Sequence, residues 1–173
     1  TFNLIEEQVT PHTLGDNILT NGDFSDNSVP DTWNGSAEVE LVGWGSGQTH
    51  DATHHFSITE QGRCRIQAAS SNIDIRQDNV LVVGKLYYYS IEVTDVTAGS
   101  IRLESQSEGD ISSSINSTGT HTGYFIATYT RFYIKRVSGE TDVTFDNVSV
   151  KLVNGNAGLM TNMAVADIEE ETP

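Results

Sequence analysis

The stretch "KLYYYSIEVTDV", residues 85–96, decides the fold class of this chain. Its bulky residues from Tyr87 to Val93 fall on every second position, and polar residues such as Ser90 and Glu92 lie between them. Aromatic and β-branched residues with a period of two are typical of a strand with one buried face. Since one strand cannot bury that face alone, we expect further strands around it.

Extended runs of the same kind recur on both sides of this stretch, with polar turn residues between them. They cover residues 17–24, 37–44, 54–59, 63–69, 73–82, 100–106, 122–137 and 142–153. The run 122–137 is long enough for two strands, with a break near 128–130. About nine strands with no helical pattern between them predict an antiparallel β-sandwich or barrel rather than alternating strands and helices.

The alternation also predicts which side chains point into the core. A shift of one residue would invert every assignment, so the prediction is specific. The inward positions are Phe24, Val39, Leu41, Ile66, Tyr87, Tyr89, Ile91, Val93, Ile101, Leu103, Phe132, Ile134, Phe145 and Val148. The outward positions are Tyr88, Ser90, Glu92, Arg102, Glu104, Tyr133 and Lys135.

Length and charge exclude several classes of function. A chain of 173 residues suits one domain with tails. Its net charge of -15, with only nine Lys and Arg, repels phosphate backbones, so we expect no nucleic-acid partner. No apolar run reaches about 18 residues, so we expect no membrane insertion. The lone Cys64 excludes an internal disulfide, and we interpret it as a small core residue.

Three motifs follow one another in order: "NILTNGDFSD" at 17–26, "VGKLYYYSIEV" at 83–93 and "VTFDNVSVKLV" at 143–153. With them, residues 17–153 resemble the jelly-roll carbohydrate-binding modules of the galactose-binding-like superfamily, which are attached to xylanases and cellulases. The resemblance implies an all-β fold, a sandwich of two stacked antiparallel sheets. Residues 1–16 then form an N-terminal arm, and residues 154–173 a C-terminal arm or linker.

The resemblance also implies a structural calcium ion where the first strand meets the last. Its ligands would be Asp23, Asp146 and a backbone carbonyl near Gly62. Calcium takes six to eight oxygen ligands, which carboxylates and carbonyls supply. In that arrangement Phe24 points into the core and Asp23 faces the other way. The alternative is that both Asp side chains only cap turns.

Members of this superfamily bind glycans with aromatic platforms and polar side chains on a sheet face or at loop tips. Aromatic rings stack on the C–H faces of sugars, and polar groups hold the hydroxyls. Trp33 corresponds to a Trp that usually has a structural packing role in these modules, so it is not among the candidates for carbohydrate binding. The candidates for carbohydrate binding are Trp44, Tyr88, Tyr133, Arg76, Gln77, Glu92, Arg102 and Gln106.

The segment "HDATHH", residues 50–55, raises the question of a transition-metal site. Imidazoles ligate zinc or nickel, but this segment lies in a predicted loop and strand start, so we favour a polar loop. Glu104 and Glu108 could in principle act as a glycosidase pair, yet nothing in the sequence fixes their separation. We expect no catalytic activity.

The tail "AGLMTNMAVADIEEETP", residues 157–173, is similar in style to segments of structural proteins of tailed bacteriophages. We therefore expect a non-catalytic structural or adhesion protein of a phage virion, such as a tail-fibre or capsid-decoration component. Its partners would be a glycan or polysaccharide and other subunits of the same assembly. The alternative is a carbohydrate-binding module of a secreted polysaccharide-degrading enzyme, and a small hydrolase ranks third. Both leading hypotheses place the chain on a virion or outside the cell.

Overall fold

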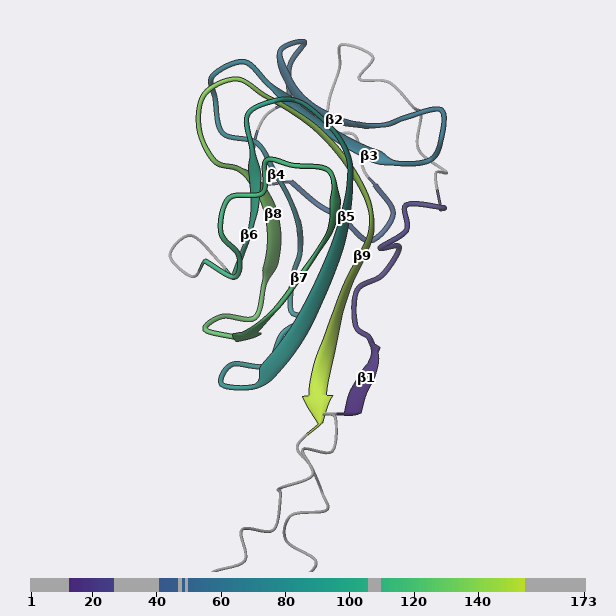
Figure 1. The fold of residues 1–173 in the computed structure, drawn as a ribbon, viewed down its shortest axis with the longest axis vertical. Helices are drawn as coiled ribbons and strands as arrows, with labels where there is room; N and C mark the ends of the chain where they lie inside the picture. The colour runs from purple at the N-terminus through teal and green to yellow at the C-terminus, as the bar shows by residue number, and fades with distance from the viewer. Residues whose placement is uncertain (1–12, 27–40, 47, 49, 106–109, 155–173) are drawn as a thin grey trace, which may run out of the picture.

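The computed structural model describes residues 13–26, 41–46, 48, 50–105 and 110–154. Within them the chain is built of strands and turns, without helix, and none of it forms a helix long and apolar enough to cross a membrane. The strands, which Figure 1 shows in two layers, are β1 Thr13–Asn17, β2 His54–Ile58, β3 Cys64–Ala68, β4 Asp74–Gln77, β5 Leu86–Ala98, β6 Ile101–Glu104, β7 Gly119–Ile126, β8 Phe132–Arg136 and β9 Thr141–Asn154.

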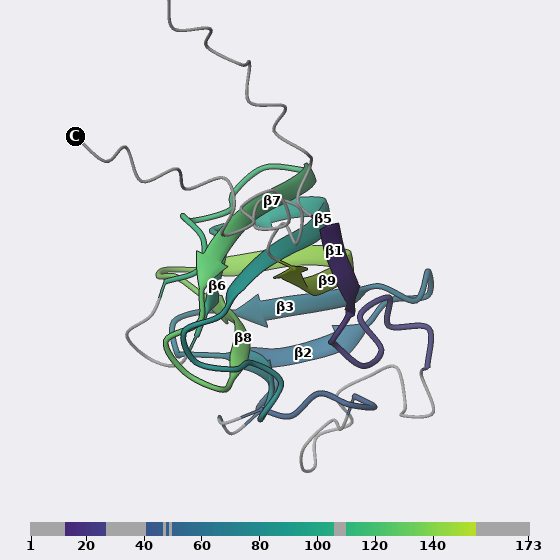
Figure 2. The same ribbon diagram turned by 90° about the horizontal axis from the view of Figure 1, so that it is seen from below.

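Two antiparallel sheets make up the sandwich. The large sheet has the order β2-β3-β9-β5-β7, with β1 also paired to β9, and the small sheet has the order β4-β8-β6. Figure 2 shows the strands of the large sheet following one another in this order. The predicted antiparallel β-sandwich of about nine strands is therefore confirmed.

The early and late parts of the chain lie side by side, as the three motifs imply. The Val148 N–H donates to the Gly22 carbonyl at 2.8 Å, and the Ile18 N–H donates to the Val150 carbonyl at 2.9 Å. Strand β9 bulges nearby, because Asn147 has a φ of 51° and interrupts the register with β5. Asn tolerates this left-handed conformation better than most residues.

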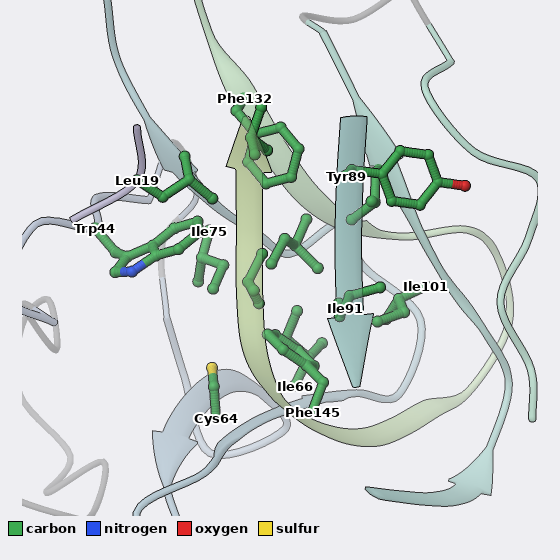
Figure 3. Close-up of a cluster of buried hydrophobic side chains, with 14 of the residues drawn as sticks. Leu19, Trp44, Cys64, Ile66, Ile75, Tyr89, Ile91, Ile101, Phe132 and Phe145 are labelled. Atoms are coloured by element: carbon green, nitrogen blue, oxygen red, sulfur yellow. The ribbon is translucent and has the colours of Figure 1, made fainter. Parts of the chain in front are cut away.

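The core fills the space between the two sheets with side chains from both (Figure 3). Every predicted inward residue that the structure describes is buried, and Val39 lies outside the described residues. Cys64 is fully buried, as expected, and burial raises the pKa of its thiol well above the usual value. A thiol held protonated in this way is a core group and not a nucleophile.

Phe24 enters the core directly after a turn. The turn residue Asn21 and Phe24 itself have φ values of 48° and 50°. The Phe24 ring lies 5.7 Å from the rings of both Trp44 and Phe145, and its side chain is fully buried. The contacts in the core compensate for the cost of a left-handed backbone at an aromatic residue.

Three of the predicted strands differ from the structure. The run 73–82 keeps only Asp74–Gln77 as β4, since Asn79, just after it, has a left-handed φ of 59°. Residues 18–24 form turns, whereas the first strand is β1, which begins at Thr13 inside the segment expected to be an arm. The sequence Asn21-Gly22 explains this, because both residues favour turn conformations. Residues 41–44 form a turn closed by one bridge between Leu41 and Trp44, and residues 37–40 lie outside the described residues. The rest of the expected arms, 1–12 and 155–173, also lie outside them.

Candidate functional site

The outer face of the small sheet gathers aromatic, basic and acidic side chains. Strand β8 is its central strand and presents Tyr133 and Lys135 on the face opposite to the buried Phe132 and Ile134. The register sets Arg76 of β4 opposite Tyr133. On the other side of β8, Tyr133 pairs with Glu104 and Lys135 pairs with Arg102, both from β6.

These side chains line an open depression of about 280 Å³. The Arg76 guanidinium carbon lies 5.8 Å from the centroid of the Tyr133 ring, which is a cation–π contact. Among the described residues, the Tyr133 ring is the one aromatic surface that lines the depression. The lining residues are Gln48, Asn72, Asp74, Arg76, Glu104, Tyr133 and Lys135.

Glu104 organises the basic groups of this face. Its Oε1 lies 2.5 Å from Arg102 Nε, and its Oε2 lies 3.2 Å from Lys135 Nζ. The sequence predicted an exposed Glu104, but its residue exposure is only 1%. Glu104 does lie on the outer face, and the two cations that bind its oxygens cover it. Both oxygens of a buried carboxylate thus have charged partners, as burial of a charge requires.

A second ion-pair cluster lies beside this one. Asp78 Oδ1 is 2.9 Å from Arg131 Nε and 3.5 Å from Arg76 Nε. Arg131 Nη1 also donates to the Tyr133 hydroxyl at 3.4 Å, and this contact and the Asp78 charge raise the pKa of Arg131. Four of the nine basic residues of the chain are therefore on or beside this face. In a chain of net charge -15, this is a region of nearly balanced charge.

Two predicted glycan-binding residues belong to the interior instead. Trp44 is 3% exposed, and its ring packs against Phe24 and against Phe132, so neither ring face is open to a sugar. Gln77 is also buried, and its amide exchanges hydrogen bonds with the backbone N–H and carbonyl of Thr20 at 3.0 and 2.6 Å. Both residues fix the segment around Thr20 against the small sheet.

The other candidates are divided between the two sheets. Tyr88 and Glu92 lie on the outer face of the large sheet, away from Tyr133. The Tyr88 ring is 5.1 Å from that of Tyr124, and Glu92 accepts a 2.7 Å hydrogen bond from the Asn147 amide. Gln106 lies outside the described residues. The structure thus brings together Arg76, Arg102 and Tyr133 of the eight candidates.

The predicted glycan-binding residues did not include five residues that line the depression, among them Glu104, which the sequence had suggested only as half of a glycosidase pair. Lys135 and Asp74 had a usable signal, because the period of two places them on the same side as Tyr133 and Arg76. Gln48 and Asn72 lie in loops, where no periodicity indicates the direction of a side chain.

The expected calcium ligands Asp23 and Asp146 lie near one another. Burial raises the pKa of Asp146, and the negative charges of Glu92 and Asp23 raise it further, against a hydrogen bond from the Asn147 N–H and the charge of Arg63. These carboxylates repel one another, and a cation between them would remove that repulsion.

Each of the two carboxylates uses one oxygen for hydrogen bonds within its own turn. Asp23 Oδ1 accepts from the Ser25 N–H and hydroxyl, and Asp146 Oδ1 accepts from the Asn147 N–H. Within the part of the chain described, this leaves Oδ2 of each carboxylate for another ligand. Gly62 lies in the turn before β3, where its N–H donates to the Thr59 carbonyl. The described residues hold no group of three His, Cys, Asp or Glu side chains placed for a metal, so backbone oxygens would complete the set.

In the histidine-rich segment, residues 50–55, the His54 imidazole forms hydrogen bonds within the protein. His54 Nε2 accepts backbone N–H groups of Ser70 and Ser71 at 3.1 and 2.9 Å, so the ring proton is on Nδ1, which lies 3.1 Å from Asp51 Oδ1. Hydrogen bonds from Thr53 and then from His54 lower the pKa of Asp51 to about 2. His54 ties two loops together, in agreement with the prediction of a polar loop.

No protein-family model matches the sequence, and no curated protein matches it. Solved structures do. The CBM22-1 xylan-binding domain of Xyn10C from Paenibacillus barcinonensis is 12% identical, with a TM-score of 0.53 over 82% of this chain and 97% of that chain. Tailspike protein 4 of bacteriophage CBA120 is 14% identical, with a TM-score of 0.44 over 79% of this chain and 21% of that chain. A structure titled "CBM4 structure and function" is 17% identical, with a TM-score of 0.43. The likeness to the CBM22-1 domain shows that the chain has the jelly-roll fold of carbohydrate-binding modules.

Proposed function

We propose that the outer face of the small sheet binds a carbohydrate chain, with Tyr133 as the stacking platform. The observation that carries the proposal is the Tyr133 ring set among polar and charged side chains in an open depression. An aromatic face supplies apolar contact to the C–H side of a sugar ring, and the groups around it bind hydroxyls. The similar fold of a xylan-binding domain supports this assignment.

The ion pairs hold the polar groups of this face in place. Glu104 fixes Arg102 and Lys135, and Asp78 fixes Arg76 and Arg131. Donors that are already fixed lose little side-chain entropy when a ligand binds, which favours affinity. The depression is open and near the low end of the usual range of about 300–1,000 Å³, so it suits a short segment of a longer glycan.

The proposed role is binding without catalysis. Both oxygens of Glu104 are paired with cations, so its contacts are those of a group that positions its neighbours. For the biological setting we keep the virion component as the first hypothesis and the module of a secreted polysaccharide-degrading enzyme as the alternative. The style of residues 157–173 supports the first. Mass spectrometry of purified phage particles, compared with culture supernatant, would separate the two.

A structural calcium ion held by Asp23, Asp146 and backbone oxygens near Gly62 is the second part of the proposal. The raised pKa of Asp146, caused first by burial and then by the nearby charges of Glu92 and Asp23, supports it. The ion would join the turn after β1 to the bulge of β9 and would stabilise the fold. It has no part in the glycan contact that we propose on the other sheet.

The glycan proposal is tested by isothermal titration with a panel of soluble polysaccharides that includes xylan. Tyr133→Ala should abolish binding or weaken it several-fold, since an aromatic contact contributes about 0.5–1.5 kcal/mol beyond the apolar area that it buries. The matched control is Glu92→Ala, because Glu92 is also a predicted binding residue and is half-buried on the outer face of the other sheet. Equal losses in the two variants, or a loss in Glu92→Ala alone, would move the site away from the small sheet.

A further inference from the structure

Exposed apolar side chains gather at one end of the sandwich. Among the described residues, seven large apolar side chains are exposed, and all but Leu14 lie at the start of β5, at the end of β7 or in the loops beside them. Leu86 of β5 pairs with Ile126 of β7, and the Gly84 N–H bonds the Ala127 carbonyl, so these segments are neighbours. The six side chains are Val82, Val83, Leu86, Tyr124, Ile126 and Tyr129.

The segments that carry these side chains, residues 80–88 and 119–130, form what we call the apolar end. They comprise 21 residues, 9 and 12 respectively, and Lys85 is their one residue of the Asp, Glu, Lys and Arg types. The whole chain has 24 acidic and nine basic residues, or 19% charged residues, so about four would be expected in 21. The apolar end thus lacks the acidic residues that give the chain its charge of -15.

Strand β7 adds an open sheet edge to the apolar end. It is the last strand of the large sheet, and its register with β5 is unbroken over eight pairs from Leu86–Ile126 to Val93–Gly119. Edge strands are usually protected by charged residues, proline or bulges, and β7 has none of these. Within the described chain, its outer backbone groups have no backbone partner. A regular, uncharged edge beside exposed apolar side chains is a template for strand pairing.

We propose that a second copy of this chain docks on the apolar end, with the two β7 edges in the interface. Two chains of charge -15 repel one another, and the 21 residues of the apolar end include no acidic residue, so they add nothing to that repulsion. A basic partner would instead be attracted to the acidic surfaces elsewhere. An antiparallel pairing of two identical edges is self-complementary, which a closed two-fold dimer requires.

This interface does not depend on the proposed glycan site, because it centres on the edge of the large sheet, whereas Tyr133 lies on the small sheet. A dimer would present two such faces. Two linked sites bind a repeating polymer more tightly than one site does. The gain in affinity is about 10²-fold or more when the geometry allows both sites to be occupied.

Sedimentation velocity of the full chain over a range of concentrations tests the proposal. We expect a reversible monomer–dimer equilibrium that shifts toward dimer when salt is raised, because screening reduces the repulsion between acidic copies. Ile126→Lys should weaken the dimer at least about tenfold, as expected for an apolar interface residue. Ile126 is 63% exposed, so this change should leave the fold intact. Val83→Lys, in a loop and 57% exposed, is a second variant outside the strands.

The matched control is Ser71→Lys, which adds the same charge at an exposed position in the loop between β3 and β4. It should dimerise at least as well as the parent chain. A parent chain that stays monomeric at every concentration, or Ile126→Lys and Val83→Lys variants that dimerise like the parent, would overturn the proposal. So would a dimer that dissociates as salt is raised, because that would indicate an electrostatic interface elsewhere.

Discussion

Replacement of Glu104 by Gln would test the ion-pair network that holds the proposed binding face. The change keeps the size of the side chain and removes the charge that Arg102 and Lys135 share. The Glu104 side chain is 2% exposed, whereas Arg102 and Lys135 are 30% and 21% exposed. The variant therefore leaves Lys135 without this anion and leaves Arg102 with the exposed Asp110 as its remaining partner among the described residues.

The expected loss of stability follows from these exposures. Removal of one partner from a fully buried pair costs about 3–5 kcal/mol. Here the two cations keep part of their hydration, and the Gln carbonyl still accepts one hydrogen bond, so we expect a loss of about 2–3 kcal/mol. The matched control is Asp110→Asn, because Asp110 lies 3.3 Å from the same Arg102 but is 60% exposed. An exposed pair of that kind contributes about 0–1 kcal/mol.

Urea unfolding at neutral pH measures both variants against the parent. The Glu104→Gln midpoint should fall clearly with an unchanged slope, and the Asp110→Asn midpoint should stay close to the parent value. High salt should erase the small Asp110 effect and leave most of the Glu104 effect, because buried pairs are poorly screened. Equal midpoints for the two variants would refute the reasoning that burial of Glu104 makes its ion pairs strong.

Three further predictions concern the parts of the fold around the site. Gly22→Ala should cost about 1–3 kcal/mol in urea unfolding, because the added Cβ would lie 2.1 Å from the Val148 carbonyl oxygen, whereas Gly45→Ala, with open space around it, should be mild. Asp146→Asn should raise the melting temperature in EDTA, because the raised pKa of Asp146 means that its negative charge is unfavourable in the folded state at neutral pH. The variant should also lose the rise in melting temperature that calcium produces in the parent. If EDTA leaves the melting temperature of the parent unchanged, the calcium proposal is wrong. Asp51→Asn should lose stability at neutral pH, and the deficit should disappear as the pH falls from 3.8 through about 2, where the parent carboxylate is protonated too; a deficit that persists in acid would contradict the cause given for the lowered pKa.

The strands and the core could be predicted from the sequence because a period of two depends only on the order of residues. In β5, Tyr87 to Val93 alternate inward and outward as expected, and the run 122–137 divides into β7 and β8 at the predicted break. The same rule failed at residues 18–24, where the conformation of Asn21 outweighs the apolar pattern. Local turn preferences and periodicity compete there, and the contacts of Phe24 in the core decide the outcome.

The candidate site was less predictable because its residues meet only after the sheets have formed. Trp44 is an aromatic residue in a polar segment, which suggested an exposed platform for a sugar. In the structure, the loop that carries Trp44 pairs with β4, since Gly45 and Arg76 exchange backbone hydrogen bonds at 2.9 and 2.8 Å. That long-range pairing turns the indole into the core. The burial of Glu104 likewise depends on Lys135, a residue of another strand. The sequence pattern of a single segment therefore predicts neither the burial of Trp44 nor that of Glu104.

The most direct test of the central claim is a two-dimensional NMR titration of the amide resonances with each soluble polysaccharide of the panel. If the outer face of the small sheet is the binding site, the shifts should concentrate at residues 72–78, 102–104 and 131–135, and the outer face of the large sheet around Tyr88 should stay unchanged. Shifts centred on β5 and β7, or no shifts with any polysaccharide of the panel, would contradict the account.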